Sequence, residues 1–258
     1  MAEARDEELI RRLEDATINS WPGAFLVKDG AWFLRLTPGH PSRRANSLSV
    51  LDPADGENAP QRLIAMMAAC RRLGAEPVVR WTPLMPAELD RALDAAGFRA
   101  FEETRVLTAP LAPLAQSAPE GEIELMEAAP AERAAYADRL VALGGEAPEF
   151  GGLLAAILGR IALPAVLAVA KAGGRPVAAA LTVIDGPLAG IFEVITAADA
   201  RRAGHGTRAV RAALAHARTH GATTGWLQVK TANTGAAAAY ARLGFAEVYR
   251  YHYRRRPA

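Results

Sequence analysis

The sequence has 258 residues, 51% of them apolar, which is enough for one large or two small domains with packed cores. Its 30 basic and 28 acidic residues give a net charge of +2, and this near balance argues against a nucleic-acid-binding protein. No apolar stretch reaches the 18 residues of a membrane span, and the single cysteine, Cys70, has no partner for an intrachain disulfide.

The N-terminal half alternates predicted helices and strands. Residues 1–15 alternate acidic and basic side chains without an apolar stretch, which excludes a secretory signal and favours a cytoplasmic location. Apolar periodicity then predicts, in order, a helix over about 6–16, strands over 31–36 and 47–51, a helix over 59–73, a strand over 77–81, a helix over 86–96 and a strand over 98–108. Cys70 lies on the second of these helices, where we expect a buried structural thiol.

Prolines interrupt the pattern between residues 109 and 121, which predicts a linker between two domains, 1–115 and 120–258. The second half is expected to contain, in order, a strand over 122–126, helices over 131–143 and 150–158, strands over 165–172, 177–184 and 191–196, a helix over 204–220, a strand over 223–229, a helix from Asn233 and a last strand from Phe245. This mixed order predicts an α/β or α+β fold in which helices pack on a mixed sheet.

A glycine-containing loop joins the predicted strand over 191–196 to the helix over 204–220. Its sequence is Arg201-Arg202-Ala203-Gly204-His205-Gly206-Thr207. The glycines let the backbone approach a ligand closely, and the helix that begins here directs its unpaired N–H groups and the positive end of its dipole to the same point. The loop therefore predicts a binding site for a pyrophosphate group.

The same loop also fits the dinucleotide-binding pattern Gly-x-Gly-x-x-Ala, through Gly204, Gly206 and Ala209. Five residues separate the strand from the glycine region, however, whereas a dinucleotide-binding site turns almost at once. The next strand ends in Gln228 and Lys230 and offers no acidic residue for a ribose hydroxyl. A dinucleotide-binding protein is kept as a minor alternative.

Asn233 and Tyr240 are seven residues apart, which is close to two helical turns, so both side chains can reach one ligand. Each residue alone also has a structural explanation. Asn233 is a suitable helix N-cap, and Tyr240 can pack beside Ala236, Ala239 and Leu243. Combined with the glycine loop, the pair favours an acyl-CoA-dependent N-acyltransferase.

These segments resemble two motifs of the GNAT superfamily of N-acetyltransferases. Arg201, Gly204 and Gly206 match the pattern Arg/Gln-x-x-Gly-x-Gly/Ala. The later pattern Asn-x-x-Ala-x-x-x-Tyr-x-x-x-Gly-Phe is matched by Asn233, Ala236, Tyr240, Gly244 and Phe245. The resemblance covers about residues 120–254. It implies a GNAT-like acyltransferase fold and direct transfer of an acetyl group from the cosubstrate acetyl-CoA to a primary amine.

The resemblance also implies which residues hold acetyl-CoA, and no metal is expected. The backbone of the strand end would pair with the pantetheine arm as an added strand would. The implied cofactor-binding residues are Val194, Ile195, Thr196, Arg201, Arg202, Ala203, Gly204, His205, Gly206, Thr207, Asn233 and Tyr240. Tyr240 is also expected to protonate the departing CoA thiolate, because a phenol with a pKa of about 10 keeps its proton at neutral pH. His205 is expected to be an incidental loop residue or a neighbour of the phosphates.

The general base is less clear. Two branches of the family place a glutamate at positions that are Gln228 and Gly190 here, and neither can accept a proton. Glu193 is the nearest acidic residue on the motif strand, and we include it as a catalytic candidate. Strict alternation puts Glu193 on the face opposite Gly190 unless a bulge shifts the register. A chain of water molecules is the other candidate.

The acceptor is expected to be a primary amine of a small molecule, an amino acid or a peptide. Arg44 is a candidate for binding an acceptor carboxylate, although a solvated surface position is the preferred interpretation of this residue, and Glu146 and Glu149 would suit a cationic amine. The basic residues near the C-terminus are interpreted as a solvated end; they are Arg250, Arg254, Arg255 and Arg256. The alternative function is a non-catalytic acyl-CoA-binding or sensing module. No nucleic acid or membrane partner is expected, and the chain is expected to be a monomer or homodimer.

A repeated spacing predicts that the two halves are tandem copies. Gly74-Ala75 precedes Gly97-Phe98 by 23 residues, and Gly221-Ala222 precedes Gly244-Phe245 by 23 residues, so the offset from Gly74 to Gly221 is 147. In the first half, the positions opposite Gly204, Gly206, Asn233 and Tyr240 are Glu57, Ala59, Pro86 and Leu93. Residues 1–115 are therefore predicted to be a degenerate GNAT-like domain without a cofactor motif.

Overall fold

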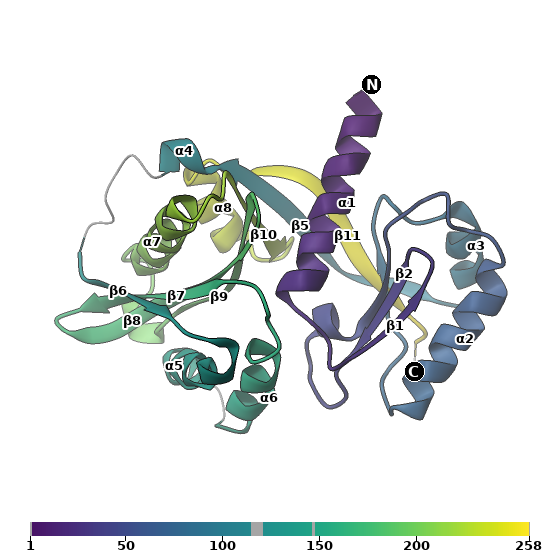
Figure 1. The fold of residues 1–258 in the computed structure, drawn as a ribbon, viewed down its shortest axis with the longest axis horizontal. Helices are drawn as coiled ribbons and strands as arrows, with labels where there is room; N and C mark the ends of the chain where they lie inside the picture. The colour runs from purple at the N-terminus through teal and green to yellow at the C-terminus, as the bar shows by residue number, and fades with distance from the viewer. Residues whose placement is uncertain (1, 115–120, 146–147, 258) are drawn as a thin grey trace. The chain divides into compact units, whose positions relative to one another are not determined.

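The computed structural model describes residues 2–114, 121–145 and 148–257. The chain forms two compact units (Figure 1). Unit 1 comprises Met1–Val106, Lys230–Ala232 and Val248–Ala258, and unit 2 comprises Leu107–Val229 and Asn233–Glu247. Both units combine helices with a sheet, so the predicted mixed class is confirmed.

In unit 1, helices cover both faces of a mixed sheet. Its strands are, in spatial order, β1 (Phe25–Asp29), β2 (Trp32–Leu36), β3 (Ser47–Val50), β4 (Val79–Trp81) and β11 (Ala246–Arg255). Its helices are α1 (Ala2–Ser20), α2 (Ala59–Arg72) and α3 (Ala87–Ala95). Trp32 and Leu34 of β2 pack in one core cluster with α2 and α3, whereas Arg35 points to the other face and donates to carbonyl groups of α1 and Trp21. Strand alternation thus gives each face its own helix layer.

A charged network is buried in unit 1 between α1, β4 and β11. Glu14 accepts two hydrogen bonds from Arg80, at 2.8 and 2.7 Å, and a third from the hydroxyl of Tyr249. The side chains of Arg80 and Glu14 are 0% and 1% exposed. Burial of such charges is tolerated because they are paired in bidentate geometry. Burial and the neighbouring Glu14 carboxylate raise the pKa of Tyr249, which keeps its hydroxyl a donor.

The interpretation of the basic C-terminal residues as a solvated end is wrong for three of the four. Arg250, Arg254 and Arg255 lie on β11, which pairs antiparallel with β4 through His252 and Trp81, whereas Arg256 lies beyond the strand and is exposed. Arg254 is 7% exposed and forms ion pairs with Asp90 and Asp94 of α3. Arg250 and Arg255 also form ion pairs, with Glu103 and Glu76. Ion pairs with acidic residues from distant segments of unit 1 therefore stabilise this basic segment as a strand.

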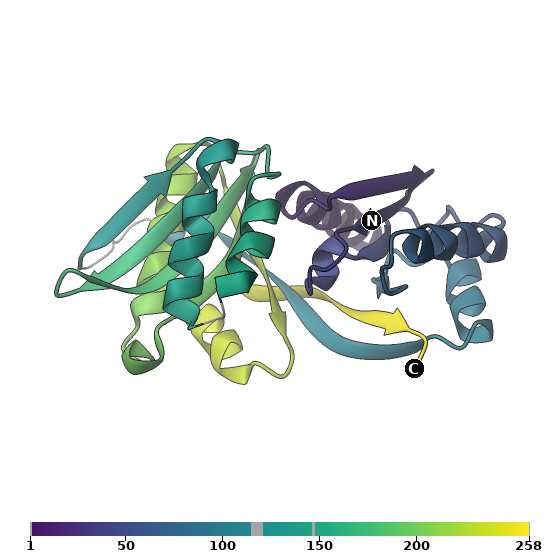
Figure 2. The ribbon, with the colours of Figure 1, turned by 90° about the horizontal axis from the view of Figure 1, so that it is seen from below.

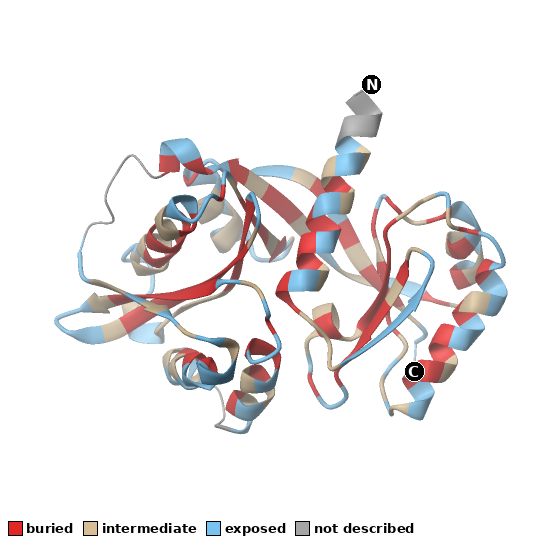
Figure 3. Cartoon of the chain, viewed as in Figure 1, coloured by how far each residue is buried: buried red, intermediate tan, exposed pale blue. Residues whose placement is uncertain are grey.

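Unit 2 contains a sheet with α7 on one face and α5 and α6 on the other (Figures 1 and 2). Its strands are, in spatial order, β10 (Thr224–Lys230), β9 (Leu188–Thr196), β8 (Arg175–Asp185), β7 (Ala165–Ala172) and β6 (Ile123–Glu127). Its helices are α4 (Leu111–Leu114), α5 (Ala134–Gly144), α6 (Pro148–Leu158), α7 (His205–Thr219) and α8 (Thr234–Arg242). Strands β6 to β9 pair antiparallel, and β10 is parallel to β9. The buried residues follow the central strands and the inner side of α7 (Figure 3).

Three strands are divided between the units, and one of them, β10, has only its last residue, Lys230, in unit 1. β5 (Arg99–Pro110) begins in unit 1 and ends in unit 2, and β11 begins in unit 2 and ends in unit 1. The residues Leu107, Ala109, Leu111 and Leu114, at the end of β5 and in α4, are buried in the core of unit 2. The predicted linker between 109 and 121 is therefore structured as far as Leu114, because these apolar side chains have a core to enter. Residues 115–120 lie outside the described part of the chain.

The backbones of the two halves repeat at the predicted offset of 147 residues. This offset carries α3 onto α8 from end to end, and α2 onto all of α7 except its first residue. The hydrogen bond from the Phe98 N–H to the Leu93 carbonyl, at 2.9 Å, recurs from Phe245 to Tyr240 at 3.1 Å. The glycines that end these helices also share positive φ angles: Gly74, Gly97, Gly221 and Gly244, at 64°, 77°, 91° and 85°.

Cys70 is a free, fully buried thiol in the core of unit 1, as predicted. Burial raises the pKa of this thiol, which lowers its reactivity. Among the helices in the described ranges, none combines the length and apolarity that crossing a membrane requires.

Candidate active site

The glycine loop of unit 2 ends at the start of α7. A short 3-10 turn (Ala198–Ala200) follows β9, and Gly204 then adopts φ 78° and ψ 0° as the N-cap of α7. The first bond of the helix runs from the Arg208 N–H to the Gly204 carbonyl at 3.0 Å. The N–H groups of His205, Gly206 and Thr207 consequently have no partner within the helix. They form the donor set that a phosphate group requires.

Gly206 brings the start of α7 against the end of β9. A Cβ atom added at Gly206 would lie 2.9 Å from Oγ1 of Thr196 and 3.8 Å from Cγ1 of Val194. Real Cβ atoms almost never show the shorter of these contacts, so a larger residue would force either the Thr196 side chain or the start of α7 to shift. Predicted residues from both segments, Val194, Thr196 and Gly206, are thus brought together.

A β-bulge lies on β9 at Glu193 and Val194. Leu181 of β8 is opposite Phe192, but Ala179 is opposite Ile195, so two residues of β9 face one residue of β8. The half-buried Glu193 has φ 46° at this point. A bulge leaves backbone groups outside the regular ladder and redirects the side chains that follow. The bulge that could break the alternation of side chains at Glu193 is therefore present in the structure.

The space beside Gly190 is filled by aromatic rings. A Cβ atom at Gly190 would lie 2.7 Å from Cζ2 of Trp226, whose ring packs edge-on against Phe192 with centroids 5.5 Å apart. This environment leaves no room for a carboxylate at position 190. Whatever base the site uses must come from elsewhere.

Asn233 and Tyr240 lie at the start and near the end of α8. The side-chain oxygen of Asn233 accepts the Ala236 N–H at 3.1 Å, so Asn233 is the helix N-cap. Tyr240 packs edge-on against Phe245, with ring centroids 6.0 Å apart, and borders the same core cluster as Val194. Burial raises the pKa of Tyr240 to about 12. Asn233 is therefore a helix cap and Tyr240 a packing residue, as expected from the sequence. The raised pKa of Tyr240 also keeps its hydroxyl protonated at neutral pH.

Positive charge surrounds the glycine loop. Arg201 and Arg202 are exposed, and the Nε of Arg201 donates to the Thr196 carbonyl at 3.4 Å. Arg208 contacts the ring of His205 through its guanidinium group. Arg208 is not among the residues expected from the motif, although a basic residue one helical turn after Gly204 is visible in the sequence. Cationic side chains beside a helix N-terminus suit an anionic ligand.

The residues considered for the acceptor lie on separate elements. Arg44 belongs to unit 1, where its guanidinium lies 4.8 Å from the ring centroid of Trp21. Glu149 is exposed in the first turn of α6, and Glu146 lies outside the described residues.

Comparisons with known proteins find likenesses along nearly the whole chain. The family model described as probable histone acetyltransferase Rv0428c C-terminal matches residues 8–254. The uncharacterized N-acetyltransferase YobR of Bacillus subtilis (strain 168) is 27% identical over 248 residues, which cover 95% of this chain and 98% of YobR. A GCN5-related N-acetyltransferase from Kribbella flavida has a similar structure, with a TM-score of 0.66 and 19% identity, over 96% of this chain and 95% of that one. A tandem GNAT protein from the clavulanic acid biosynthesis pathway is similar with a TM-score of 0.64 and 17% identity, over 94% and 86% of the two chains.

Proposed function

Because this chain belongs to the GNAT superfamily of N-acetyltransferases, in the family of the probable histone acetyltransferase Rv0428c C-terminal domain, we propose that it transfers an acetyl group from acetyl-CoA to a primary amine. The predicted fold of two tandem GNAT-like copies is confirmed by the repeated backbone and by the tandem structural relative. Family membership also favours an enzyme over the sensing module. The relatives described above are acetyltransferases, which favours acetyl-CoA over a dinucleotide as the ligand of the glycine loop.

The observation that carries the proposal is the close approach of Gly206 to Thr196 beside the bulge on β9. This close approach places the N–H groups at the start of α7 beside the end of β9, residues Val194 to Thr196. Phosphates would be held by the backbone of Arg202 to Thr207 and by the charges of Arg201 and Arg202. The pantetheine arm would pair with the backbone at the strand end.

Acetyl-CoA would supply the activated acetyl group, and Tyr240 would supply the proton. At neutral pH the phenol of Tyr240 is protonated, because its pKa of about 12 lies far above that pH. Tyr240 would give this proton to the sulfur of the departing thiolate, and the edge-on packing against Phe245 would keep the ring in place.

The amine must be neutral when it attacks, so a group near the bulge has to accept its proton. Glu193 remains a candidate because the bulge breaks strict alternation at its position, and a water chain is the other. The acceptor would be a small molecule, an amino acid or a peptide. A cytoplasmic location and a monomeric or homodimeric state remain predictions.

Substitution of Gly206 by valine tests the phosphate site. Its side chain would occupy the space between the start of α7 and Thr196, where we propose that the phosphates approach the N–H groups of α7. Loss of even one charge-assisted hydrogen bond, worth about 1.5–3 kcal/mol, should weaken acetyl-CoA binding about 10- to 100-fold. Calorimetry with acetyl-CoA and with NADH measures this. Gly152→Val, in an exposed turn of α6 where an added Cβ would meet no other atom within 4 Å, is the matched control and should bind normally. Binding of NADH in place of acetyl-CoA would contradict the proposal.

We also propose that residues 120–258 carry the chemistry and that residues 1–115 are a degenerate copy. At the positions opposite Gly204 and Tyr240, the first copy has Glu57 and Leu93, a carboxylate that would repel phosphate and a side chain with no proton to give. Titration of the whole chain should therefore give one acetyl-CoA per chain. A stoichiometry of two would show that the first copy has kept a cofactor site.

A further inference from the structure

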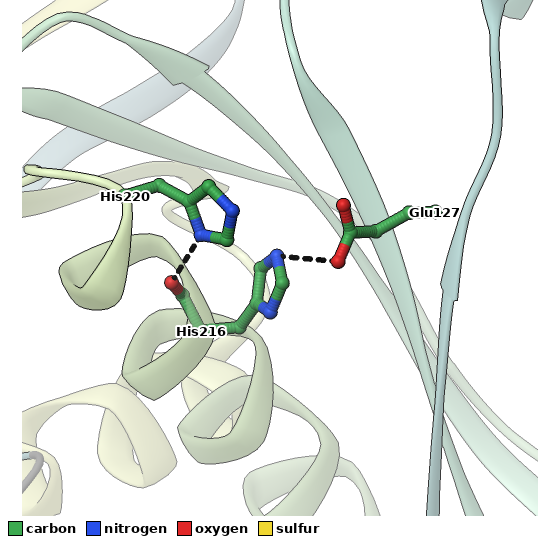
Figure 4. A group of neighbouring side chains, drawn as sticks. All are labelled: Glu127, His216 and His220. Carbon is green, nitrogen blue, oxygen red and sulfur yellow. Dashed lines mark hydrogen bonds and ion pairs between the residues drawn. The ribbon is translucent and has the colours of Figure 1, made fainter.

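A group of metal-ligating side chains lies at the opposite end of α7 from the glycine loop. Glu127, His216 and His220 each offer one ligand atom, and these atoms all lie within 4.8 Å of one another (Figure 4). All three residues belong to unit 2, so their arrangement depends on a single compact body. The acyl-transfer site proposed above uses none of them.

Two elements of secondary structure bring the three side chains together. His216 and His220 are four residues apart at the C-terminal end of α7, so both project from one side of the helix. Their rings lie 4.3 Å apart between centroids. Glu127 is the last residue of β6, on the same side of that strand as Ile123, which packs against the core that includes α7.

The hydrogen bonds orient the imidazoles toward the centre of the group. Nδ1 of His220 lies 3.0 Å from the carbonyl oxygen of His216. The same Nδ1 lies 3.2 Å from Oγ1 of Thr219. Because a carbonyl oxygen can only accept, the contact with His216 favours the tautomer that has the hydrogen on Nδ1 and the lone pair on Nε2. A histidine that binds metal is commonly fixed in this way by a carbonyl group behind it. Nε2 of His216 lies 3.2 Å from Oε1 of Glu127, so these two ligand atoms already adjoin.

We propose that Glu127, His216 and His220 form a zinc-binding site that joins β6 to the C-terminal end of α7. Two imidazole nitrogens and one carboxylate oxygen are a ligand set that zinc accepts, with water completing the coordination. With metal–ligand distances of about 2.0–2.2 Å, ligands in a tetrahedral site lie about 3.4 Å apart. The pair His216 and Glu127 meets this spacing. His220 is exposed and Glu127 is 61% exposed, so both side chains can move to close the remaining separation.

The site is separate from acyl transfer. α7 has 15 residues, so its ends are about 22 Å apart. A cation at the C-terminal end of a helix is also favoured by the helix dipole. The metal would fasten β6, the last strand in the spatial order of the sheet of unit 2, to the helix that covers it.

Cobalt substitution tests the proposal on the full chain without a histidine tag. Co²⁺ should bind with a stoichiometry of one and produce visible d–d absorption bands, and Zn²⁺ should remove these bands because it binds such sites more tightly. Glu127→Gln, His216→Asn and His220→Gln should each weaken Zn²⁺ binding at least about tenfold in calorimetry. His252→Gln, which changes a histidine stacked on Trp81 in unit 1, is the matched control and should leave zinc binding unchanged.

Thermal unfolding separates a metal site from a simple ion pair. Zn²⁺ should raise the Tm of the wild-type chain and of His252→Gln but not that of His220→Gln, whose exposed position leaves the fold intact. This variant keeps the test valid even if His216→Asn unfolds. Absence of cobalt bands in the wild type, or zinc binding that persists unchanged in the three cluster variants, would overturn the proposal.

Discussion

Tyr240→Phe should lower kcat for acetyl transfer about 100-fold and leave the KM for acetyl-CoA nearly unchanged. The substitution keeps the ring that packs against Phe245 and removes only the phenolic proton. Burial raises the pKa of Tyr240 to about 12, so the phenol loses its proton only as the pH rises through that value. The ratio of the kcat of the wild type to the kcat of Tyr240→Phe should therefore stay constant between about pH 7 and pH 10. Release of free thiol, followed at several pH values, measures it.

Tyr136→Phe is the control for this experiment. Tyr136 is also a tyrosine of unit 2 with a pKa raised to about 12 by burial, but its hydroxyl donates to the backbone carbonyl of Met126. Its removal should cost about 1 kcal/mol of folding stability and leave kcat unchanged. An unchanged kcat in Tyr240→Phe would return Tyr240 to a packing role, whereas a raised KM alone would make it a binding residue.

A fragment comprising residues 118–258 should not fold into an active enzyme, although it contains every predicted catalytic and cofactor-binding residue. It lacks four buried residues of the core of unit 2: Leu107, Ala109, Leu111 and Leu114. Burial of one leucine side chain contributes about 1.5–3 kcal/mol, so the three leucines together are comparable with the whole stability of a typical domain. We expect the fragment to be poorly soluble, and circular dichroism with near-ultraviolet detection should show little fixed tertiary structure.

A single substitution in the full chain isolates the same effect. Leu111→Ala should lower the free energy of unfolding by about 2–5 kcal/mol, because Leu111 is fully buried and its removal leaves a cavity. Ile64→Ala, at a side chain 65% exposed on α2, should cost far less. A fully active and soluble fragment over 118–258 would show that unit 2 does not depend on the end of β5.

Most secondary structure follows from local patterns in the sequence. The helix predicted over 86–96 is α3, Ala87–Ala95, because its apolar spacing and the glycine after it mark a complete amphipathic helix. β1 has no such signal. Its residues are all exposed, and three apolar side chains follow one another at Phe25, Leu26 and Val27 without alternation. Only pairing with β2 makes this segment a strand.

Some features of the candidate site can likewise be predicted from local sequence, and others depend on the folded structure. The donor groups at the start of α7 and the cap of α8 follow from glycine and asparagine positions, which are local properties of the chain. The bulge at Glu193 depends on the register between β8 and β9, and no residue type near it requires a bulge. The contact of Arg208 with His205 and the filled space beside Gly190 depend on side-chain packing, so they too become visible only in the folded chain.

The buried network of Glu14, Arg80 and Tyr249 has a kinetic consequence for protein synthesis. Glu14 and Tyr249 are separated by 235 residues, and at about 5–20 residues per second a ribosome needs about 12–47 s to make the intervening chain. Throughout this interval the carboxylate of Glu14 lacks one of its donors, and from the completion of β4 onward the edge of β4 that pairs with β11 has no strand beside it. Unpaired strand edges of this kind are prone to aggregation, so the nascent N-terminal unit should depend on chaperones until β11 has been made. Synthesis of β11 therefore decides when the first unit can finish folding.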